Sequence, residues 1–143
     1  MSSLLHAPPG PPVRLPRHVR VLTKSWGGFF LAMAAVNASL VALGHADVYA
    51  AMADDSPIGL YRAVWQQLVP PHPLPWALAL IAFEIAVGVA ALGRGRAPLA
   101  ALIASILFVV GLIPASPPYT SWNALLALVP AYLLLRHLRD AGP

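Results

Sequence analysis

Four long apolar segments constrain what this chain can fold into. They comprise residues 25–44, 74–93, 97–115 and 122–138. An α-helix rises about 1.5 Å per residue, so about 20 apolar residues cross the roughly 30 Å hydrocarbon core of a bilayer. The last segment contains Pro130 and Arg136, but membrane helices tolerate proline where neighbouring groups satisfy the freed backbone carbonyl. We therefore predict an all-α fold, an integral membrane four-helix bundle.

Composition agrees with a membrane protein and narrows the available chemistry. Hydrophobic residues make up 59% of the 143 residues and charged residues 10%, whereas soluble domains average about 45–50% and 25%. The sequence has no cysteine, which excludes disulfides, iron–sulfur clusters and thiolate metal sites. It also has no phosphate-binding loop, hydrolase nucleophile elbow or metal-binding helix motif. We therefore expect no resident metal.

Positive charges gather on one side of the predicted spans. Eight of the nine Lys and Arg residues lie before the first span, between the second and third, or after the fourth: Arg14, Arg17, Arg20, Lys24, Arg94, Arg96, Arg136 and Arg139. The loop 45–73 holds Arg62 alone against Asp47, Asp54 and Asp55. The positive-inside rule then predicts a multi-pass protein with both termini cytoplasmic. The same excess sets topology rather than binding nucleic acid. The bias toward Arg over Lys and toward Ala, Pro and Leu is typical of a GC-rich bacterial genome, so we expect a bacterial inner (cytoplasmic) membrane.

The residues before and after the spans are predicted to be tails. Residues 1–24 form a disordered Pro-rich cytoplasmic tail, since the first twenty residues contain five prolines, and residues 139–143 form a second tail. A cleaved signal peptide is the alternative for the first segment, because "DVYAAMA" (47–53) offers small residues at A-x-A spacing. The apolar run is about twice the usual core of a signal peptide, which favours an uncleaved anchor helix.

The long loop after the first span is predicted to contain a short amphipathic helix. Ser56 followed by Pro57 is a helix-start signal, with the hydroxyl as N-cap. Apolar residues then recur at helical spacing, at Ile58, Tyr61, Val64, Trp65 and Leu68. Such a helix lies on the outer membrane surface, with Tyr61 and Trp65 as its interfacial aromatic residues. It either covers the bundle or acts as a lid over a site.

Glu84 stands near the middle of the second span, in "ALIAFEIAVG" (79–88). Placing an acid at the bilayer centre costs about 2.5–3.5 kcal/mol on insertion scales, so its side chain should face the bundle. Burial favours the neutral carboxyl, which donates a hydrogen bond. Gly88 lies one turn further on the same face and allows a neighbouring helix to approach closely. Asn37, at similar depth in the first span, is the expected partner. It either forms a structural hydrogen bond between the helices or belongs to a polar centre shared with Glu84.

Other polar and small residues give weaker signals. His45, Asp47 and His72 lie near the outer ends of the first two spans and form an alternative outer-surface ligand site. No histidine lies in the middle of a span, which disfavours haem ligation. Small residues at i, i+4 spacing predict close-packing stripes on two helices: Ala82, Ala86 and Ala90, and Ala97, Ala101 and Ser105.

The second and third spans carry a recognisable pattern, "FEIAVGVAALGRGR" followed by "APLAALIASILFVVGL". With four spans and a long outer loop after the first, residues 25–138 resemble the DoxX-like family of small bacterial membrane proteins. Glu84, Gly88, Gly93, Arg94 and Arg96 match the glutamate, glycines and basic turn that this family commonly carries. The resemblance implies a membrane bundle that works with quinone-linked sulfur oxidation or with partner membrane enzymes.

Three functions remain open. The first is a non-enzymatic accessory or assembly subunit of a membrane complex, with a buried polar centre at Glu84 and Asn37 and with another membrane protein or a second copy as its partner. The second is a subunit of a quinone-linked oxidoreductase in which Glu84 handles protons, with quinone as the cofactor. The third is a proton-coupled carrier of a small solute. No residue of this sequence is assigned a catalytic role, and the sequence does not decide whether the protein is an enzyme.

Overall fold

The structure is a computed structural model that describes residues 15–115 and 117–140. Its elements in chain order are α1 (Arg17–Ala42), the 3₁₀ helix η1 (Ala46–Ala53), α2 (Gly59–Leu68), α3 (Pro73–Leu92), α4 (Ala97–Leu112) and α5 (Pro117–Asp140). The described residues form no strand, so the prediction of an all-α fold is confirmed for them. By length and apolar composition, α1 and α3 are able to cross a membrane, and α4 is a shorter apolar helix.

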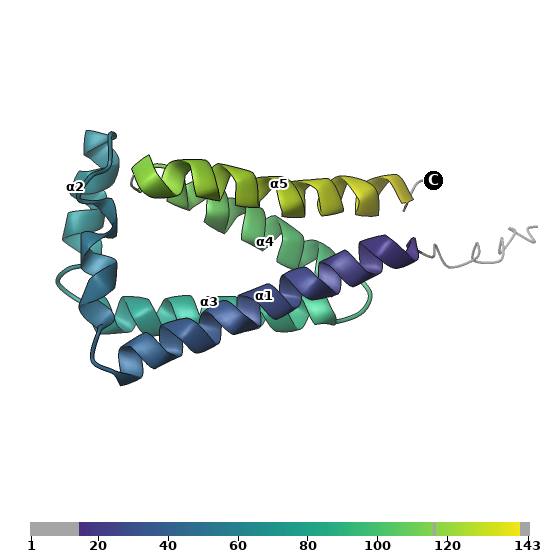
Figure 1. Ribbon diagram of the computed structural model, residues 1–143, viewed down its shortest axis with the longest axis horizontal. Helices are drawn as coiled ribbons and strands as arrows, with labels where there is room; N and C mark the ends of the chain where they lie inside the picture. Colours follow the sequence, from purple (N-terminus) through teal and green to yellow (C-terminus); the bar gives the residue numbers. More distant parts are fainter. Residues whose placement is uncertain (1–14, 116, 141–143) are drawn as a thin grey trace, which may run out of the picture.

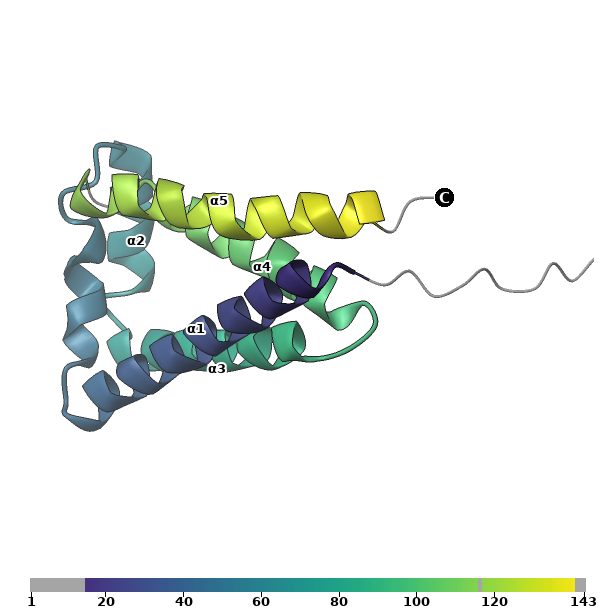
Figure 2. The ribbon, with the colours of Figure 1, turned by 45° about the vertical axis from the view of Figure 1, so that its right-hand side comes forward.

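The helices are arranged as two pairs that form a wedge. Helices α1 and α3 cross and pack on each other, and α4 and α5 form an antiparallel pair (Figure 1). The pairs converge beside the turn that joins α3 to α4 and diverge toward the opposite end (Figure 2). There η1 and α2 run across the open side of the wedge. One end of the molecule is therefore closed by helix packing and the other by these two short helices.

The crossing of α1 and α3 depends on two glycines that face each other. A Cβ atom added to Gly27 would lie 2.9 Å from the Gly88 carbonyl oxygen, and one added to Gly88 would lie 2.7 Å from Leu31 Cγ. Small residues allow helix backbones to approach this closely, and the helices then gain dispersion contacts along their length. The expectation that Gly88 permits a close approach on the Glu84 face agrees with this geometry.

An aromatic cluster joins the two helix pairs midway along the wedge. The rings of Phe30, Phe83 and Phe108 come from α1, α3 and α4, with centroid distances of 6.4, 6.4 and 4.9 Å. Toward the closed end, Trp26 Nε1 donates a hydrogen bond of 3.0 Å to Ser105 Oγ, which ties α1 to α4. Edge-to-face and tilted ring pairs add about 0.5–1.5 kcal/mol each beyond their buried area. This cluster therefore fixes the depth at which the wedge begins to open.

Two helix starts differ from the predictions. Helix α1 begins at Arg17, so residues 17–24 are helical and are not part of a disordered tail; residues 1–14 lie outside the described part of the chain. The last proline before the first span is Pro16, which serves as N-cap, and Val19 and Thr23 are buried beyond it. Helix α2 begins at Gly59 rather than at Pro57, with Ile58 as its N-cap. The Ser56 hydroxyl accepts from the Ile58 backbone N–H at 3.3 Å and donates to the Pro114 carbonyl of another segment.

The two small-residue stripes differ in burial, and the prediction left open whether each packs inside the bundle or against a partner. Ala101 and Ser105 of α4 are buried, but Ala82 and Ala86 of α3 are exposed. Helix α3 instead buries the face that carries Ala77, Glu84, Val87, Gly88 and Ala91. A helix that is apolar all round shows no preferred face in its sequence, so the single acid was the better indicator of the buried side.

We predict that Gly88→Ala lowers the free energy of unfolding by about 1–3 kcal/mol, because the new methyl group overpacks the α1/α3 crossing. The measurement is denaturant unfolding in detergent micelles followed by far-UV circular dichroism. Gly28→Ala is the matched control, since a Cβ there meets nothing within 4 Å and alanine gains about 1 kcal/mol of helix propensity. Equal stability of the two variants would contradict the close-crossing interpretation.

Candidate ligand-binding site

A buried chain of hydrogen bonds links η1, α1 and α3. Asn37 Nδ2 donates to both carboxyl oxygens of Glu84, at 2.9 Å to Oε1 and 2.8 Å to Oε2. The Tyr49 hydroxyl donates to Asn37 Oδ1 at 2.7 Å. The side chains of Glu84, Asn37 and Tyr49 are only 3%, 6% and 7% exposed. The structure thus brings Glu84 and Asn37 into direct contact and adds a third member, Tyr49, that the sequence did not single out.

The direction of these bonds differs from the expected donor role of Glu84. Both carboxyl oxygens accept from Asn37, and the amide uses its carbonyl oxygen to accept from Tyr49. Hydrogen bonds to a carboxyl stabilise it inside a low-dielectric interior, where an unpaired acid would be costly. Asn37 therefore bridges the two elements: its amide NH₂ group bonds to Glu84 of α3, and its carbonyl oxygen bonds to Tyr49 of η1.

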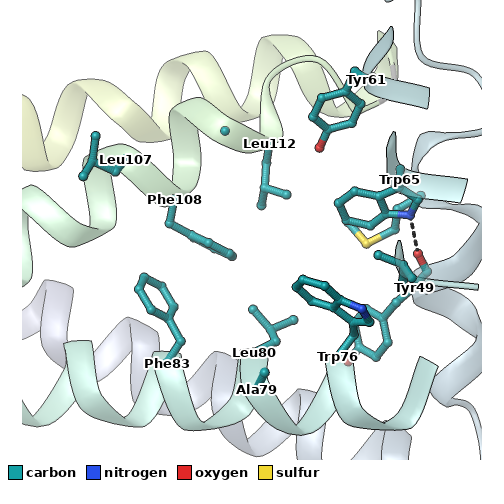
Figure 3. Close-up of a pocket in the computed structure, with 13 residues that line it drawn as sticks. Tyr49, Tyr61, Trp65, Trp76, Ala79, Leu80, Phe83, Leu107, Phe108 and Leu112 are labelled. Carbon is teal, nitrogen blue, oxygen red and sulfur yellow. Dashed lines mark hydrogen bonds between the residues drawn. The ribbon is translucent and has the colours of Figure 1, made fainter. Parts of the chain in front are cut away.

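Tyr49 connects this polar chain to the open side of the wedge. Burial raises the pKa of Tyr49 above its ordinary value, and the negative charge of Glu84 raises the pKa further. Tyr49 therefore keeps its proton at neutral pH and remains a donor. The backbone carbonyl of Tyr49 in turn accepts a hydrogen bond of 3.0 Å from Trp65 Nε1, which anchors α2 to η1 (Figure 3).

A partly open cavity of about 400 Å³ occupies the wide part of the wedge. Its walls come from α3 and α4, and η1 and α2 close it at one end. The aromatic part of the lining consists of Tyr49, Tyr61, Trp65, Trp76, Phe83 and Phe108, and the remaining lining residues are aliphatic, methionine or glycine. The rings face a common space in Figure 3. This volume and lining are typical of a site for a small apolar molecule.

The Tyr61 hydroxyl is the polar side-chain group that this cavity offers a ligand. The Tyr49 hydroxyl donates to Asn37 Oδ1, and the indole N–H groups of Trp65 and Trp76 donate to the backbone carbonyls of Tyr49 and Leu68. The Tyr61 hydroxyl is directed toward the cavity interior in Figure 3, and burial raises the pKa of Tyr61, so it also stays protonated. The Tyr61 and Trp65 rings stack with centroids 5.8 Å apart. The cavity can therefore hold a flat apolar ring between aromatic side chains and offer it a phenol donor.

The other predicted site residues lie elsewhere. His45, Asp47 and His72 are exposed at the ends of the elements that surround the cavity. Within residues 15–115 and 117–140, no group of three or more His, Cys, Asp or Glu side chains is placed to hold a metal ion. The three residues consequently do not form a three-ligand metal site in this structure. Tyr61 and Trp65, predicted as interfacial residues of a helix that covers the bundle or acts as a lid, line the cavity.

The aromatic lining and Tyr49 are the features that the sequence reasoning missed. Phe83 and Phe108 are ordinary members of apolar segments, and Tyr49 stands in "DVYAAMA", whose small residues are typical of a cleavage site rather than of a polar centre. An intramembrane acid predicts that polar partners surround it, and Tyr49 is a hydroxyl close in sequence to Asn37. The sequence therefore indicates that Glu84 needs further polar partners. Tyr49 meets Asn37, however, only because η1 folds back over α1.

Comparisons with protein-family models, with curated proteins and with solved structures find no match for this chain. The function of the site is therefore argued from its geometry.

We predict that Tyr49→Phe lowers the free energy of unfolding by about 1–3 kcal/mol, because it leaves Asn37 Oδ1 buried without a donor. Denaturant unfolding in detergent micelles measures the change. Tyr132→Phe serves as the control, since Tyr132 is 48% exposed and loses no buried bond. If both substitutions have the same small effect, the Tyr49 hydroxyl does not support the buried chain.

Proposed function

We propose that this chain is a bacterial inner-membrane protein of the DoxX-like kind, with α1, α3, α4 and α5 as its four spans. Charge placement supports this. The cationic segments are the start of α1, the α3–α4 turn and the end of α5, and all three lie at the same end of the molecule (Figure 1). The positive-inside rule places that end in the cytoplasm and the η1/α2 end outside.

The lateral surface supports the same placement. Large apolar side chains that are more than half exposed occur on all four long helices, for example Val36, Val89, Leu107 and Leu128. A soluble protein rarely exposes apolar residues so widely, whereas lipid chains satisfy them. Helix α4 has 16 residues, which gives about 24 Å; local bilayer thinning accommodates a short span at modest cost.

We further propose that the protein is the quinone-binding subunit of a membrane oxidoreductase, with the aromatic cavity as its site. The single observation that carries this proposal is a 400 Å³ apolar cavity whose wall member Tyr49 is hydrogen-bonded through Asn37 toward Glu84. A quinone is a flat, membrane-soluble ring with two carbonyl acceptors, so the ring-lined walls and the Tyr61 hydroxyl fit its chemistry. When bound, a quinone accepts two electrons and two protons, and we propose that a partner subunit supplies the electrons.

The residues of this chain have separate roles in that proposal. Phe83, Phe108 and Trp65 exclude water and orient the ring, and Tyr61 donates a hydrogen bond to a carbonyl oxygen. Tyr49 and Asn37 hold the polar wall in place. Glu84 lies behind that wall and does not line the cavity, so we propose that it exchanges protons with the bound quinone through water rather than through the Asn37 amide. A purely structural accessory subunit explains the buried polar chain, but it gives no role to the cavity, and for this reason we prefer the ligand-binding function.

The cavity proposal is tested by filling the cavity. Gly111 lines it, and a Cβ on Gly111 meets nothing within 4 Å, so we expect the side chain of Gly111→Leu to occupy part of the binding space. Titration of a short-tailed benzoquinone into protein in lipid nanodiscs should quench the fluorescence of Trp65 and Trp76 saturably. We expect Gly111→Leu to weaken the Kd at least about tenfold, which corresponds to about 1.4 kcal/mol.

Gly28→Leu is the matched control, because Gly28 is also helical, exposed and open to a new side chain but does not line the cavity. We expect its Kd to equal that of the unmodified protein. Quenching that does not saturate, or that both variants weaken equally, would refute a site in the cavity.

We predict that Glu84→Gln separates binding from proton transfer. Glu84 does not line the cavity, and an amide can still bond to Asn37, so the benzoquinone Kd should change less than about threefold. Quinone-dependent turnover of the native membranes should fall by about 100-fold or more, since general acid–base catalysis contributes about 10²–10⁴-fold. Full turnover in the variant would show that Glu84 is structural and would favour the accessory-subunit function.

A further inference from the structure

A second cavity lies at the opposite end of the bundle, where the two helix pairs converge. It has a volume of about 480 Å³ and is formed by α1, the α3–α4 turn and the last part of α5. Three cationic side chains line it: Arg20 and Lys24 from α1, and Arg94 from the turn. None of the described residues that line this cavity is acidic. Asp140 lies one turn after His137 on α5, outside the lining.

The inner wall of this cavity is polar and structurally fixed. The Thr23 side chain is 3% exposed and donates to the Val19 carbonyl at 2.9 Å. The Thr23 hydroxyl also lies 3.3 Å from His137 Nε2, which joins α1 to α5. Gly93 and Gly95 line the cavity from the turn, and Gly95 has a φ of 65°, a conformation that glycine adopts without strain. The turn therefore exposes its backbone and brings Arg94 to the cavity.

Three like charges around one cavity repel one another, and an anion bound between them offsets that repulsion. Arginine and lysine form strong charge-assisted bonds with phosphate oxygens. Apolar residues complete the lining, namely Leu15, Ala91, Leu92 and Pro98. Leu92 is also 42% exposed, and Val21 and Leu22 are exposed on α1 beside the cationic residues. The site thus combines a phosphate-binding rim with an apolar surface that continues onto the outside of the bundle.

We propose that this cavity binds the phosphate group of an anionic phospholipid of the inner leaflet, with the acyl chains along α1 and α3. Basic pockets between membrane helices on the cytoplasmic side bind such headgroups. The continuous apolar surface favours a lipid over free phosphate as the source. This inference rests on the proposed membrane placement, but not on quinone binding in the first cavity. A bound headgroup would hold α1, the α3–α4 turn and α5 together.

The test compares two triple variants with the same change in net charge. The cavity variant is Arg20→Gln, Lys24→Gln, Arg94→Gln. The control variant is Arg17→Gln, Arg96→Gln, Arg139→Gln, which removes exposed cations at the same end of the molecule that do not line the cavity. Native mass spectrometry in mild detergent counts bound phosphatidylglycerol and phosphatidylcholine, and the rise of Tm with phosphatidylglycerol concentration gives the apparent affinity.

We expect the unmodified protein and the control variant to retain one phosphatidylglycerol in preference to phosphatidylcholine. The cavity variant should bind phosphatidylglycerol at least about tenfold more weakly. Arg94→Gln alone, a single change in an exposed turn, should weaken binding severalfold and remains usable if the triple variant fails to fold.

Two outcomes would overturn the proposal. Equal loss in both triple variants would mean that diffuse charge, rather than this cavity, attracts the lipid. Displacement of the lipid by millimolar inorganic phosphate would identify free phosphate as the ligand. The benzoquinone titration is run on the same samples. If the lipid preference is absent but quenching is normal, only the phospholipid proposal fails. If quenching is absent but lipid binding is normal, only the quinone proposal fails.

Discussion

The hydrogen bonds between Asn37 and Glu84 are the interaction on which the rest of the structure depends. A carboxyl buried among apolar helices needs a partner, and Asn37 is the side chain of α1 that supplies it. That requirement fixes the rotation and the register of α1 on α3. Gly27 and Gly88 then meet one turn of α3 further along and allow the backbones to touch. The polar contact sets the alignment, and close packing provides the stability.

From this fixed pair, the position of α4 and α5 decides where space is left in the bundle. Phe30, Phe83 and Phe108 join the pairs at mid-depth. On one side of that cluster Trp26 and Ser105 close the bundle. On the other side the pairs separate, and η1 and α2 cover the gap with Tyr49, Tyr61 and Trp65. The short helices of the first loop are therefore part of the cavity wall, which makes the long loop a component of the candidate site.

The two cavities have opposite chemistry at opposite ends of the same bundle. The aromatic cavity is almost entirely apolar and adjoins the buried acid through Tyr49 and Asn37. The basic cavity is lined by Arg20, Lys24 and Arg94. In the proposed orientation, the first opens toward the outer half of the membrane and the second toward the cytoplasmic headgroups. A lipophilic molecule and an anionic lipid would therefore bind this chain without competing, since no residue lines both cavities.

The sequence by itself determined the helical class, the approximate helix ranges and the burial of Glu84. Long apolar runs with prolines between them leave helices as the only regular structure, and one acid among apolar residues must point inward. The sequence did not determine that Ala82 and Ala86 face outward, that α1 begins at Arg17, or that Tyr49 completes the polar chain. Those features depend on contacts between segments far apart in the chain. Both cavities are likewise tertiary features, because each is built from at least three elements whose separation is decided only when the helix pairs pack.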